Sequence, residues 1–353
     1  MPIINVLLSY DYELPLGGIT GSFDECLFAP TNELLNLAAK INVPLNFFAD
    51  VLSYDRFKHY DRKDYVESFE EQMNRAYKKG HDVQLHLHPH WKETEIKGDL
   101  FIPSDKYGLD SFVDAEFPNS IDGIIQNGIS LLNDIIQDEN YACIAYRAGG
   151  YVLAPKSNEI LTALRKNGIK IDSSVCRGYF FKSDLSTVDY SNVPNKANWY
   201  LDLNGDFTKE GNQNNGIFEI PIASKSKSIF EVPTALKMKK HAHRMPANRG
   251  RMIHNKPLRL NFADKVKKIK SSRMLTFDNY TYSPDFNMNV LTNYVDKFKD
   301  EKEIFLSAIG HPKSMGKYSL ELMEQFILKS RAKYGNNIRF VTYSEVAKTL
   351  NLQ

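Results

Sequence analysis

Residues 45–88, LNFFADVLSYDRFKHYDRKDYVESFEEQMNRAYKKGHDVQLHLH, contain the pattern that decides the fold. The apolar run Leu45–Asp50 predicts a buried strand, and Val83–His88 predicts another. Between them, Tyr65–Lys79 is polar with helical periodicity, and Gly80 stands where a capping glycine would end the helix. A strand, a helix and a second strand in this order favour two parallel strands joined by an outer helix.

The same alternation continues on both sides of this unit. It predicts a single α/β domain over residues 1–353, a distorted (β/α) barrel of roughly 7–8 parallel strands. A doubly wound open sheet is the alternative, although no glycine-rich phosphate-binding motif follows the first strand. Further strands are predicted at Ile3–Ser9, Ala142–Tyr146, Ile169–Asp172, Ile217–Ile222, Ile304–Ile309 and Ile338–Val341, and further helices at Thr31–Lys40, Ser120–Ile136, Ser157–Asn167, Asn287–Lys299, Leu320–Tyr334 and Ser344–Leu350.

Two stretches do not fit a minimal barrel, and we interpret them as insertions. They are the polar residues 91–118 and the longer residues 223–283. Long insertions in compact domains are usually lids or binding loops.

The second insertion carries most of the positive charge. Residues 236–273 hold 13 Lys and Arg and one acid, although the net charge of the whole chain is only +2. Such a segment is either a solvated face or a binding site for phosphates, for which Arg244, Arg249 and Arg251 are the candidates. A nucleotide-sugar, a diphosphate-linked lipid carrier or a peripheral membrane contact would supply those phosphates. No nucleic-acid reader motif accompanies the charge, so we expect no nucleic-acid partner.

Composition places the chain among soluble globular proteins. Of its 353 residues, 42% are hydrophobic and 25% charged, which excludes a disordered tail, a collagen and a disulfide-stapled mini-protein. Cys26, Cys143 and Cys176 are far apart and form no CxxC pair. No signal-peptide pattern opens the sequence, and no apolar run reaches the roughly 18 residues of a membrane span. We therefore expect a cytoplasmic protein.

Ionisable side chains follow five of the predicted strands. In parallel α/β folds the active groups gather at the carboxyl ends of the strands, so these residues are expected to converge. A single acid after a strand is usually a turn residue, but five such strand ends together predict an active site. The groups are Asp11 and Glu13 in SYDYE (residues 9–13), His86, His88 and His90 in HDVQLHLHPHW (residues 81–91), Arg147 in YRAGGY (residues 146–151), Asp172 in IDSS (residues 171–174) and His311 in IGHPKS (residues 309–314).

The three alternating histidines predict a metal site. Imidazoles on alternate strand residues point to one side, and a turn at Pro89 would bring His90 back toward His86. Two histidines and one carboxylate leave coordination positions open, which suits zinc or another divalent metal that activates water, and we expect zinc.

The order and spacing of these motifs resemble the polysaccharide deacetylase family, the NodB-homology carbohydrate esterases (carbohydrate esterase family 4). Within it, they resemble a divergent branch that acts in surface-polysaccharide biosynthesis. GHDVQLHLHPH (residues 80–90) resembles the family's GHEIxxHxxxH stretch, and YRAGGY its arginine motif. IDSSV resembles the YDSS of one branch, FEIPI (residues 218–222) its ExP strand, and IGHPKS its final histidine motif. The resemblance covers residues 3 to about 350, apart from the two insertions.

The resemblance implies a role for each strand-end group. One departure matters: Tyr12 stands where the family usually has a second acid. Three alternatives follow from this departure. The metal shifts from its position in the family, or His88 replaces one of the family's metal ligands, or the site holds no metal. By the resemblance, Asp11 is the base, Glu13 the metal carboxylate, His86 and His90 the metal histidines, Arg147 the residue that orients the base, Gly150 and Tyr151 the source of oxyanion-binding N–H groups, His311 the acid that protonates the departing amine, and Asp172 a neighbour of His311.

The function that follows is a metal-dependent deacetylase of an N-acetylated sugar. Cytoplasmic residence favours a nucleotide-sugar or lipid-linked saccharide, used in lipopolysaccharide O-antigen or capsule assembly. The alternatives are a hydrolase of another C–N amide bond and a non-catalytic barrel that binds carbohydrate or phosphate. The presence of both Asp11 and His311 favours an enzyme, because a binding module needs neither a base nor an acid.

Overall fold

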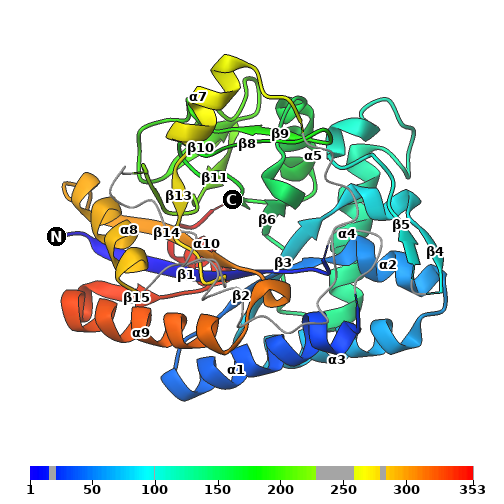
Figure 1. Ribbon diagram of the computed structural model, residues 1–353, viewed down its shortest axis with the longest axis horizontal. Helices are drawn as coiled ribbons and strands as arrows, with labels where there is room; N and C mark the ends of the chain where they lie inside the picture. Colours follow the sequence, from blue (N-terminus) through cyan, green and yellow to red (C-terminus); the bar gives the residue numbers. More distant parts are fainter. Residues whose placement is uncertain (16–20, 99, 228–257, 279–283, 353) are drawn as a thin grey trace.

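One curled sheet organises the protein. The computed structural model describes residues 1–15, 21–98, 100–227, 258–278 and 284–352. Nine strands within these residues form the sheet: β1 (Ile3–Tyr12), β2 (Asn46–Asp50), β3 (Asp82–Leu87), β6 (Ala145–Ala148), β7 (Ile171–Asp172), β10 (Trp199–Asp202), β11 (Gly216–Glu219), β14 (Glu303–Gly310) and β15 (Ile338–Phe340). Their order is β10-β11-β7-β6-β3-β2-β1-β14, with β15 also paired to β1 (Figure 1). Only β10 and β11 pair antiparallel among them.

The sheet curls until its two ends meet. The Ser307 N–H in β14 donates to the Pro221 carbonyl at 3.0 Å, and the Ala223 N–H donates to the Ser307 carbonyl at 2.9 Å. The chain just after β11 therefore closes onto β14. The predicted distorted barrel is confirmed, and the open doubly wound sheet is wrong.

Helices lie outside the sheet, as the alternating pattern predicts (Figure 1). Neighbouring helices contact one another in the pairs α8–α9, α9–α1, α3–α4 and α4–α5. The bounds are α1 (Ala29–Ile41), α2 (Val51–His59), α3 (Lys63–Lys78), α4 (Ile121–Ile136), α5 (Ser157–Lys166), α7 (Phe262–Lys270), α8 (Pro284–Lys297), α9 (Lys317–Tyr334) and α10 (Tyr343–Thr349). Within the described ranges, no helix is long and apolar enough to cross a bilayer.

The two-residue period of β1 decides what faces the barrel interior. Its even-numbered residues from Ile4 to Tyr12 pack in the large core cluster toward the helices. Leu7 instead joins a separate cluster with Phe48. Because side chains alternate along a strand, Asp11 and Glu13 extend the row of Leu7 on that inner side.

This alternation explains the unusual position of Tyr12. Its side chain points away from Asp11, packs edge-on against Phe69 at a centroid distance of 5.1 Å, and donates to Oε1 of Gln72 at 2.7 Å. Tyr12 is thus a core residue, and Glu13 is the next side chain on the inner row.

Two expectations need correction. The predicted strand Ala142–Tyr146 is shifted, because Oε1 of Gln84 binds the backbone N–H groups of Ile144 and Ala145 at 2.9 and 2.8 Å in place of a strand partner. Helix α2 has no counterpart among the predicted helices.

The insertions contain small hairpins. Residues 91–118 include β4 (Glu95–Lys97) and β5 (Leu100–Ile102). Residues 223–283 include β12 (Ser224–Lys225), α7 and β13 (Arg273–Met274), and a further hairpin joins β8 (Phe180–Lys182) to β9 (Thr187–Asp189). The candidate phosphate-binding residues Arg244, Arg249 and Arg251 lie outside the described residues.

Candidate active site

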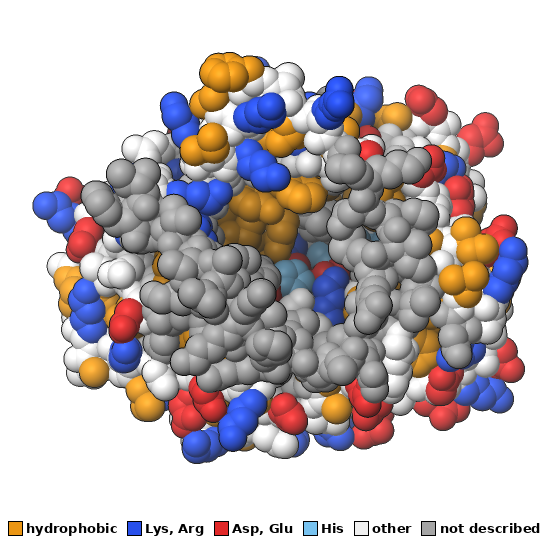
Figure 2. All heavy atoms as spheres, in the orientation of Figure 1, with side chains coloured by type: hydrophobic (Ala, Val, Ile, Leu, Met, Phe, Trp, Pro, Cys, Tyr) orange, Lys and Arg blue, Asp and Glu red, His pale blue; other side chains and the backbone are white. Residues whose placement is uncertain are grey.

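The predicted strand-end groups converge at the carboxyl ends of β1, β3, β6 and β14. Figure 2 shows a hollow in this face, with hydrophobic side chains on its wall and a histidine and charged groups at its floor. Asp11, Glu13, His86 and Arg147 are almost fully buried there, each less than 5% exposed. Burial of so many ionisable groups is costly unless they are paired or bind a ligand, so their partners decide what the site can do.

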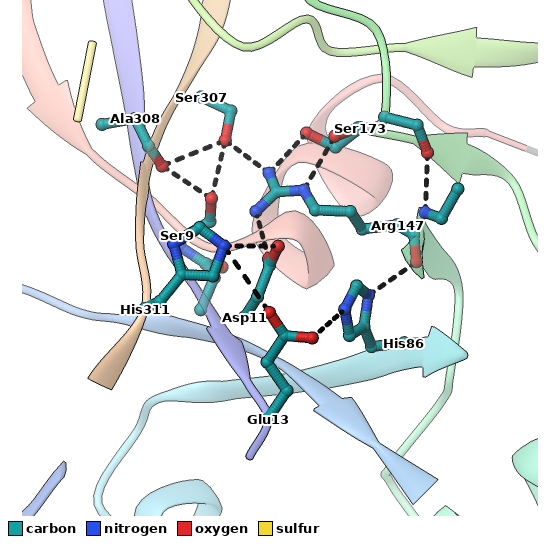
Figure 3. Close-up of polar contacts among 12 residues, drawn as sticks. Ser9, Asp11, Glu13, His86, Arg147, Ser173, Ser307, Ala308 and His311 are labelled. Carbon is teal, nitrogen blue, oxygen red and sulfur yellow. Dashed lines mark hydrogen bonds and ion pairs between the residues drawn. The ribbon is translucent and has the colours of Figure 1, made fainter. Parts of the chain in front are cut away.

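Arg147 holds Asp11 in place (Figure 3). Its Nη1 donates to Oδ1 of Asp11 at 2.8 Å. The rest of the guanidinium is fixed by the Ser173 carbonyl, 2.8 Å from Nε, and by the Ser307 hydroxyl, 2.9 Å from Nη2. Burial alone would raise the pKa of Asp11, but the guanidinium, His86 and His311 together outweigh burial and hold that pKa well below its ordinary value. Asp11 therefore stays ionised.

The two ring nitrogens of His311 face two different carboxylates. Nδ1 is 2.9 Å from Oδ2 of Asp278, and the His311 N–H donates to the other Asp278 oxygen at 2.9 Å. Nε2 lies 3.5 Å from Oδ2 of Asp11. Burial alone would lower the pKa of His311, but Asp278 and Asp11 outweigh it and raise that pKa to about 10. His311 therefore carries a proton at neutral pH. We call Asp11, Arg147, Asp278 and His311 the acid–base group.

A second cluster, Glu13, His86 and His88, has the character of a metal site; we call it the ligand group. One ligand atom from each lies within 4.8 Å of the others. His86 Nε2 is 3.4 Å from Glu13 Oε2, and His88 Nε2 contacts the same oxygen. All three atoms are buried and have no hydrogen-bond partner in the part of the chain that the structure describes. Since buried polar atoms are nearly always satisfied, these three atoms are suited to bind a ligand.

The tautomer of His86 supports metal binding. Its Nδ1 lies 2.8 Å from the carbonyl oxygen of Arg147. A carbonyl only accepts, so Nδ1 carries the hydrogen and the Nε2 lone pair faces Glu13. The neighbouring His88 is held through its backbone N–H, which donates to Oδ1 of Asp50 at 3.2 Å. A divalent ion therefore fits the donor set of the ligand group.

A second group of three residues could also hold a metal, but most of its ligand atoms already have other partners. Asp11, Glu13 and His311 also place ligand atoms within 4.8 Å of one another. However, the oxygens of Asp11 face Arg147 and His311, and Nδ1 of His311 faces Asp278. The atoms left for a metal are those of the ligand group.

The structure does not bring His90 into this group. The chain turns at Pro89 into the short helix η2 (Pro89–Glu93), and the His90 ring stacks on Tyr107 at a centroid distance of 5.0 Å. The extended backbone of His88 instead continues strand β3, so its ring follows that of His86. Of the alternatives stated for the histidines, the geometry favours His88 in place of His90 as the second imidazole.

Sequence reasoning missed Lys313. Its Nζ lies 2.7 Å from Oε1 of Glu13 and donates to the Leu14 carbonyl at 3.2 Å. Burial alone would raise the pKa of Glu13, but Lys313 and His88 outweigh it and hold that pKa well below its usual range. The signal was the lysine two residues after His311 in IGHPKS.

Asp278 was also missed, because it lies within residues 223–283, which were interpreted as an insertion. An acid directly after the apolar run MLTF (residues 274–277) was the available signal.

The expected contact between Asp172 and His311 is not present; Asp278 takes that place. The Asp172 carboxylate accepts from the Ser174 N–H at 2.9 Å and from its hydroxyl at 2.8 Å. Glu219 lies opposite it in the register of β7 and β11. Burial and the neighbouring Asp172 raise the pKa of Glu219 well above its usual range, so it stays protonated. These acids hold the segment that carries Ser173 against Arg147.

A glycine pair shapes the chain after Arg147. A Cβ on Gly149 would lie 2.4 Å from the Leu87 carbonyl oxygen and 2.9 Å from Nδ1 of His88, so only glycine fits there. Gly150 and Tyr151 follow with φ of 59° and 64°. A tyrosine with positive φ is strained, and such strain clusters at functional sites. That their N–H groups bind an oxyanion stays a prediction.

Comparisons with known proteins support the fold. No family model matches the chain, and no curated protein sequence matches it either. Among solved structures, it is similar to a proposed polysaccharide deacetylase from Mycobacterium smegmatis, with a TM-score of 0.50, 13% identity, and coverage of 99% of this chain and 91% of that one. A proposed polysaccharide deacetylase from Pseudomonas aeruginosa PAO1 matches at 0.50 and 10% identity, covering 98% and 90%.

The same fold also carries other chemistry. A 4-alpha-glucanotransferase from Thermococcus litoralis matches with a TM-score of 0.50 and 12% identity, covering 98% of this chain and 40% of that one. At these identities the likeness establishes the barrel that polysaccharide deacetylases use. Function has to be argued from the site itself.

Proposed function

We propose that this protein is a metal-dependent hydrolase that removes the acetyl group from an N-acetylated sugar. The observation that carries the proposal is the pairing of Asp11 Oδ2 and His311 Nε2 at 3.5 Å, directly beside the ligand group. An ionised carboxylate and a protonated imidazole in one hollow provide a base and an acid for the same bond. Polysaccharide deacetylases among the structures that share the fold agree with this chemistry.

The residues divide the work of amide hydrolysis. Asp11 takes the proton of the attacking water, and Arg147 keeps this carboxylate ionised and aimed at the hollow. His311 gives its Nε2 proton to the departing amine, which leaves poorly unless protonated. Asp278 holds the His311 ring through both the backbone N–H and Nδ1. N–H groups at Gly150 and Tyr151 are the proposed donors to the developing oxyanion.

The ligand group would hold the metal, and we propose zinc because two imidazoles and a carboxylate are ligands that zinc accepts. When bound, such an ion supplies Lewis-acid chemistry that makes water a stronger nucleophile and polarises a carbonyl group. Lys313 engages Oε1 of Glu13 and leaves Oε2 toward the histidines.

We further propose that the substrate is a nucleotide-sugar or a lipid-linked saccharide of surface-polysaccharide assembly, O-antigen or capsule. The positive charge of residues 236–273, which hold 13 Lys and Arg and one acid, supports a phosphate-bearing substrate and contact with a membrane surface. A cytoplasmic location would bring the enzyme to both forms.

The test is acetate release from N-acetylated sugars, with and without a chelator. We expect release that stops on metal removal and returns with added zinc. Asp11→Asn should retain the metal and lose release. Substrates without an acetamide, such as O-acetylated sugars, serve as the matched comparison. Release from N-acetylated sugars that is insensitive to both chelator and Asp11→Asn would contradict the proposal.

A further inference from the structure

A cavity of about 350 Å³ adjoins the acid–base group and combines aromatic walls with cations. No acidic residue is among the described residues that line it. Apolar walls with a few placed polar groups are typical of small-molecule sites. The residues that matter here are Tyr151, Tyr179, Phe180, Lys227, Lys268 and Arg273.

The cavity shares walls with the proposed active site. Tyr151 lies four residues after Arg147 and two residues after Gly149, which packs against His88. On the other side, Thr276 lines the cavity, and its hydroxyl is 3.2 Å from Oδ2 of Asp278. A ligand that spans the cavity and the hollow would therefore reach His311.

The positively charged side chains that line the cavity lie near one another. Nζ of Lys227 donates to the Lys268 carbonyl at 3.1 Å, which brings its charge to helix α7. Burial, Arg273 and Lys268 together lower the pKa of Lys227. Like charges held this close repel, and a bound anion would offset that repulsion while accepting charge-assisted hydrogen bonds.

The aromatic side offers a surface for the sugar. The rings of Tyr151 and Tyr179 meet edge to face at 6.1 Å. Burial raises the pKa of the Tyr179 hydroxyl to about 12, so it stays protonated and can donate to a sugar oxygen.

We propose that this cavity binds the phosphate of a phosphate-linked acylated sugar, with the sugar against Tyr151 and its acetamide in the hollow. The proposal rests on the proposed function. Nucleoside diphosphate sugars and polyprenyl diphosphate sugars share the diphosphate that Lys227, Lys268 and Arg273 would recognise.

The test is calorimetric binding to the full-length chain. The probes are inorganic pyrophosphate, a nucleoside diphosphate N-acetylhexosamine, a short-chain prenyl diphosphate N-acetylhexosamine and free N-acetylhexosamine. Lys227→Ala and Lys268→Ala should each weaken the binding of the phosphate-bearing probes by roughly tenfold. Lys270→Ala, on the same helix but outside the cavity lining, is the matched control and should bind like the wild type.

The outcomes separate the subsite from the activity. Equal affinity in the cavity variants and the control, or no binding of any phosphate-bearing probe, would overturn the subsite. A preference for one of the two diphosphate sugars supports it and identifies the source. Charge-dependent binding without acetate release would support the subsite and contradict the proposed function.

A separate observation concerns the outer face of α7. Phe262, Val266 and Ile269 recur at helical spacing and share one side, yet Phe262 is 82% and Ile269 74% exposed. Such an apolar stripe normally faces the core.

The polar side of α7 makes the contacts with the body. Asp264 pairs with Lys182 at 2.8 Å, and Lys267 pairs with Asp189 at 2.5 Å. The helix projects at one edge of the molecule, where Figure 2 shows hydrophobic side chains among Lys and Arg. Helix α7 therefore directs its polar side toward the protein and its apolar side toward solvent, the reverse of an ordinary surface helix.

We infer that α7 docks on an anionic bilayer surface. The exposed Lys265 and Lys270 flank the apolar stripe, and an apolar face bordered by lysines fits the interface of anionic lipids. This placement would bring the phosphate cavity, which Lys268 of the same helix lines, close to lipid-linked substrates.

Sedimentation with vesicles tests the docking. The full chain should bind vesicles of phosphatidylglycerol and phosphatidylcholine, but not pure phosphatidylcholine, and less at high salt. The double variant Phe262→Ser, Ile269→Ser should lose this binding, whereas Leu328→Ser, a 55% exposed leucine on α9, should keep it. Unchanged binding of the double variant would overturn the inference. So would self-association in ultracentrifugation that only the double variant loses, because a second copy would then cover the helix.

Discussion

Two groups of buried side chains share the end of one barrel, and they differ in how their polar atoms are satisfied. In the acid–base group, the guanidinium, the imidazole and Asp11 all face partners from other segments of the chain. In the ligand group, Glu13 Oε2, His86 Nε2 and His88 Nε2 converge without hydrogen bonds.

The difference indicates what each group does. A fully satisfied network is rigid and holds its protons in defined places, which suits proton transfer. A buried cluster of unsatisfied lone pairs costs free energy unless something binds it. The ligand group is therefore expected to be stabilised by a metal, and the acid–base group to be complete without one.

Removing a ligand should have the largest effect. His86→Ala and His88→Ala should each abolish retention of about one equivalent of metal. Turnover should fall on the order of 10³-fold or more, because a metal supplies several kcal/mol to the transition state. Metal analysis of purified variants and acetate release measure the two effects. His90→Ala is the matched control and should keep its metal; loss of metal there and retention in His88→Ala would reverse the ligand assignment.

Breaking the acid–base group should separate activity from metal binding. Asp11→Asn and His311→Ala should each lower turnover by roughly 10²–10⁴ with metal content unchanged. The double variant should lose less than the product of the two, since both residues act in one reaction. Turnover close to wild type in either single variant would remove that residue from the mechanism.

The sequence predicts which side chains lie together where the strand period decides their direction, and the role of each residue stays a proposal. Alternation along β1 and β3 places Asp11, Glu13, His86 and His88 on the inner side, and a parallel sheet brings strand ends together. The choice between His88 and His90 depends on how the chain turns at Pro89, which periodicity does not encode.

The residues that were missed lie beyond regular elements. Asp278 follows a segment that joins β14 only through isolated pairing at Thr276, and Lys313 lies in a short turn after His311. Gln84 likewise shortened a predicted strand by binding two backbone N–H groups from a neighbouring segment. Such long-range hydrogen bonds leave little trace in local sequence.

A smaller loss of turnover should follow when His311, the proposed acid, is kept but held less firmly. Asp278→Asn weakens the hold on the His311 ring, and we expect a loss of about 10- to 10²-fold, below that of removing the acid itself. The loss should appear in kcat, with KM and metal content unchanged. A change confined to KM would instead place Asp278 in substrate binding.

The smallest effect concerns Glu219, which touches neither group directly. Its pKa is raised in the folded state, so the fold binds this proton more tightly than the unfolded chain does. Its contribution to stability is complete below the ordinary pKa of 4.5 and is lost as the pH rises above it. Glu219→Gln keeps the neutral shape, so its unfolding free energy should improve relative to wild type as the pH rises.

Urea unfolding at several pH values measures this trend, with Glu33→Gln on the exposed side of α1 as control. Metal content and turnover of Glu219→Gln should match the wild type. A stability difference that falls as the pH rises would contradict the assignment of a buried, protonated acid.

The most direct measurement is a crystal structure of the zinc-loaded protein with anomalous scattering recorded at the zinc edge. We predict one strong peak about 2.0–2.1 Å from Nε2 of both His86 and His88, with Oε2 of Glu13 as the oxygen ligand. The contacts from Asp11 to Arg147 and from His311 to Asp278 should be unchanged. A peak among Asp11, Glu13 and His311, or no peak at saturating zinc, would contradict the division into a ligand group and an acid–base group.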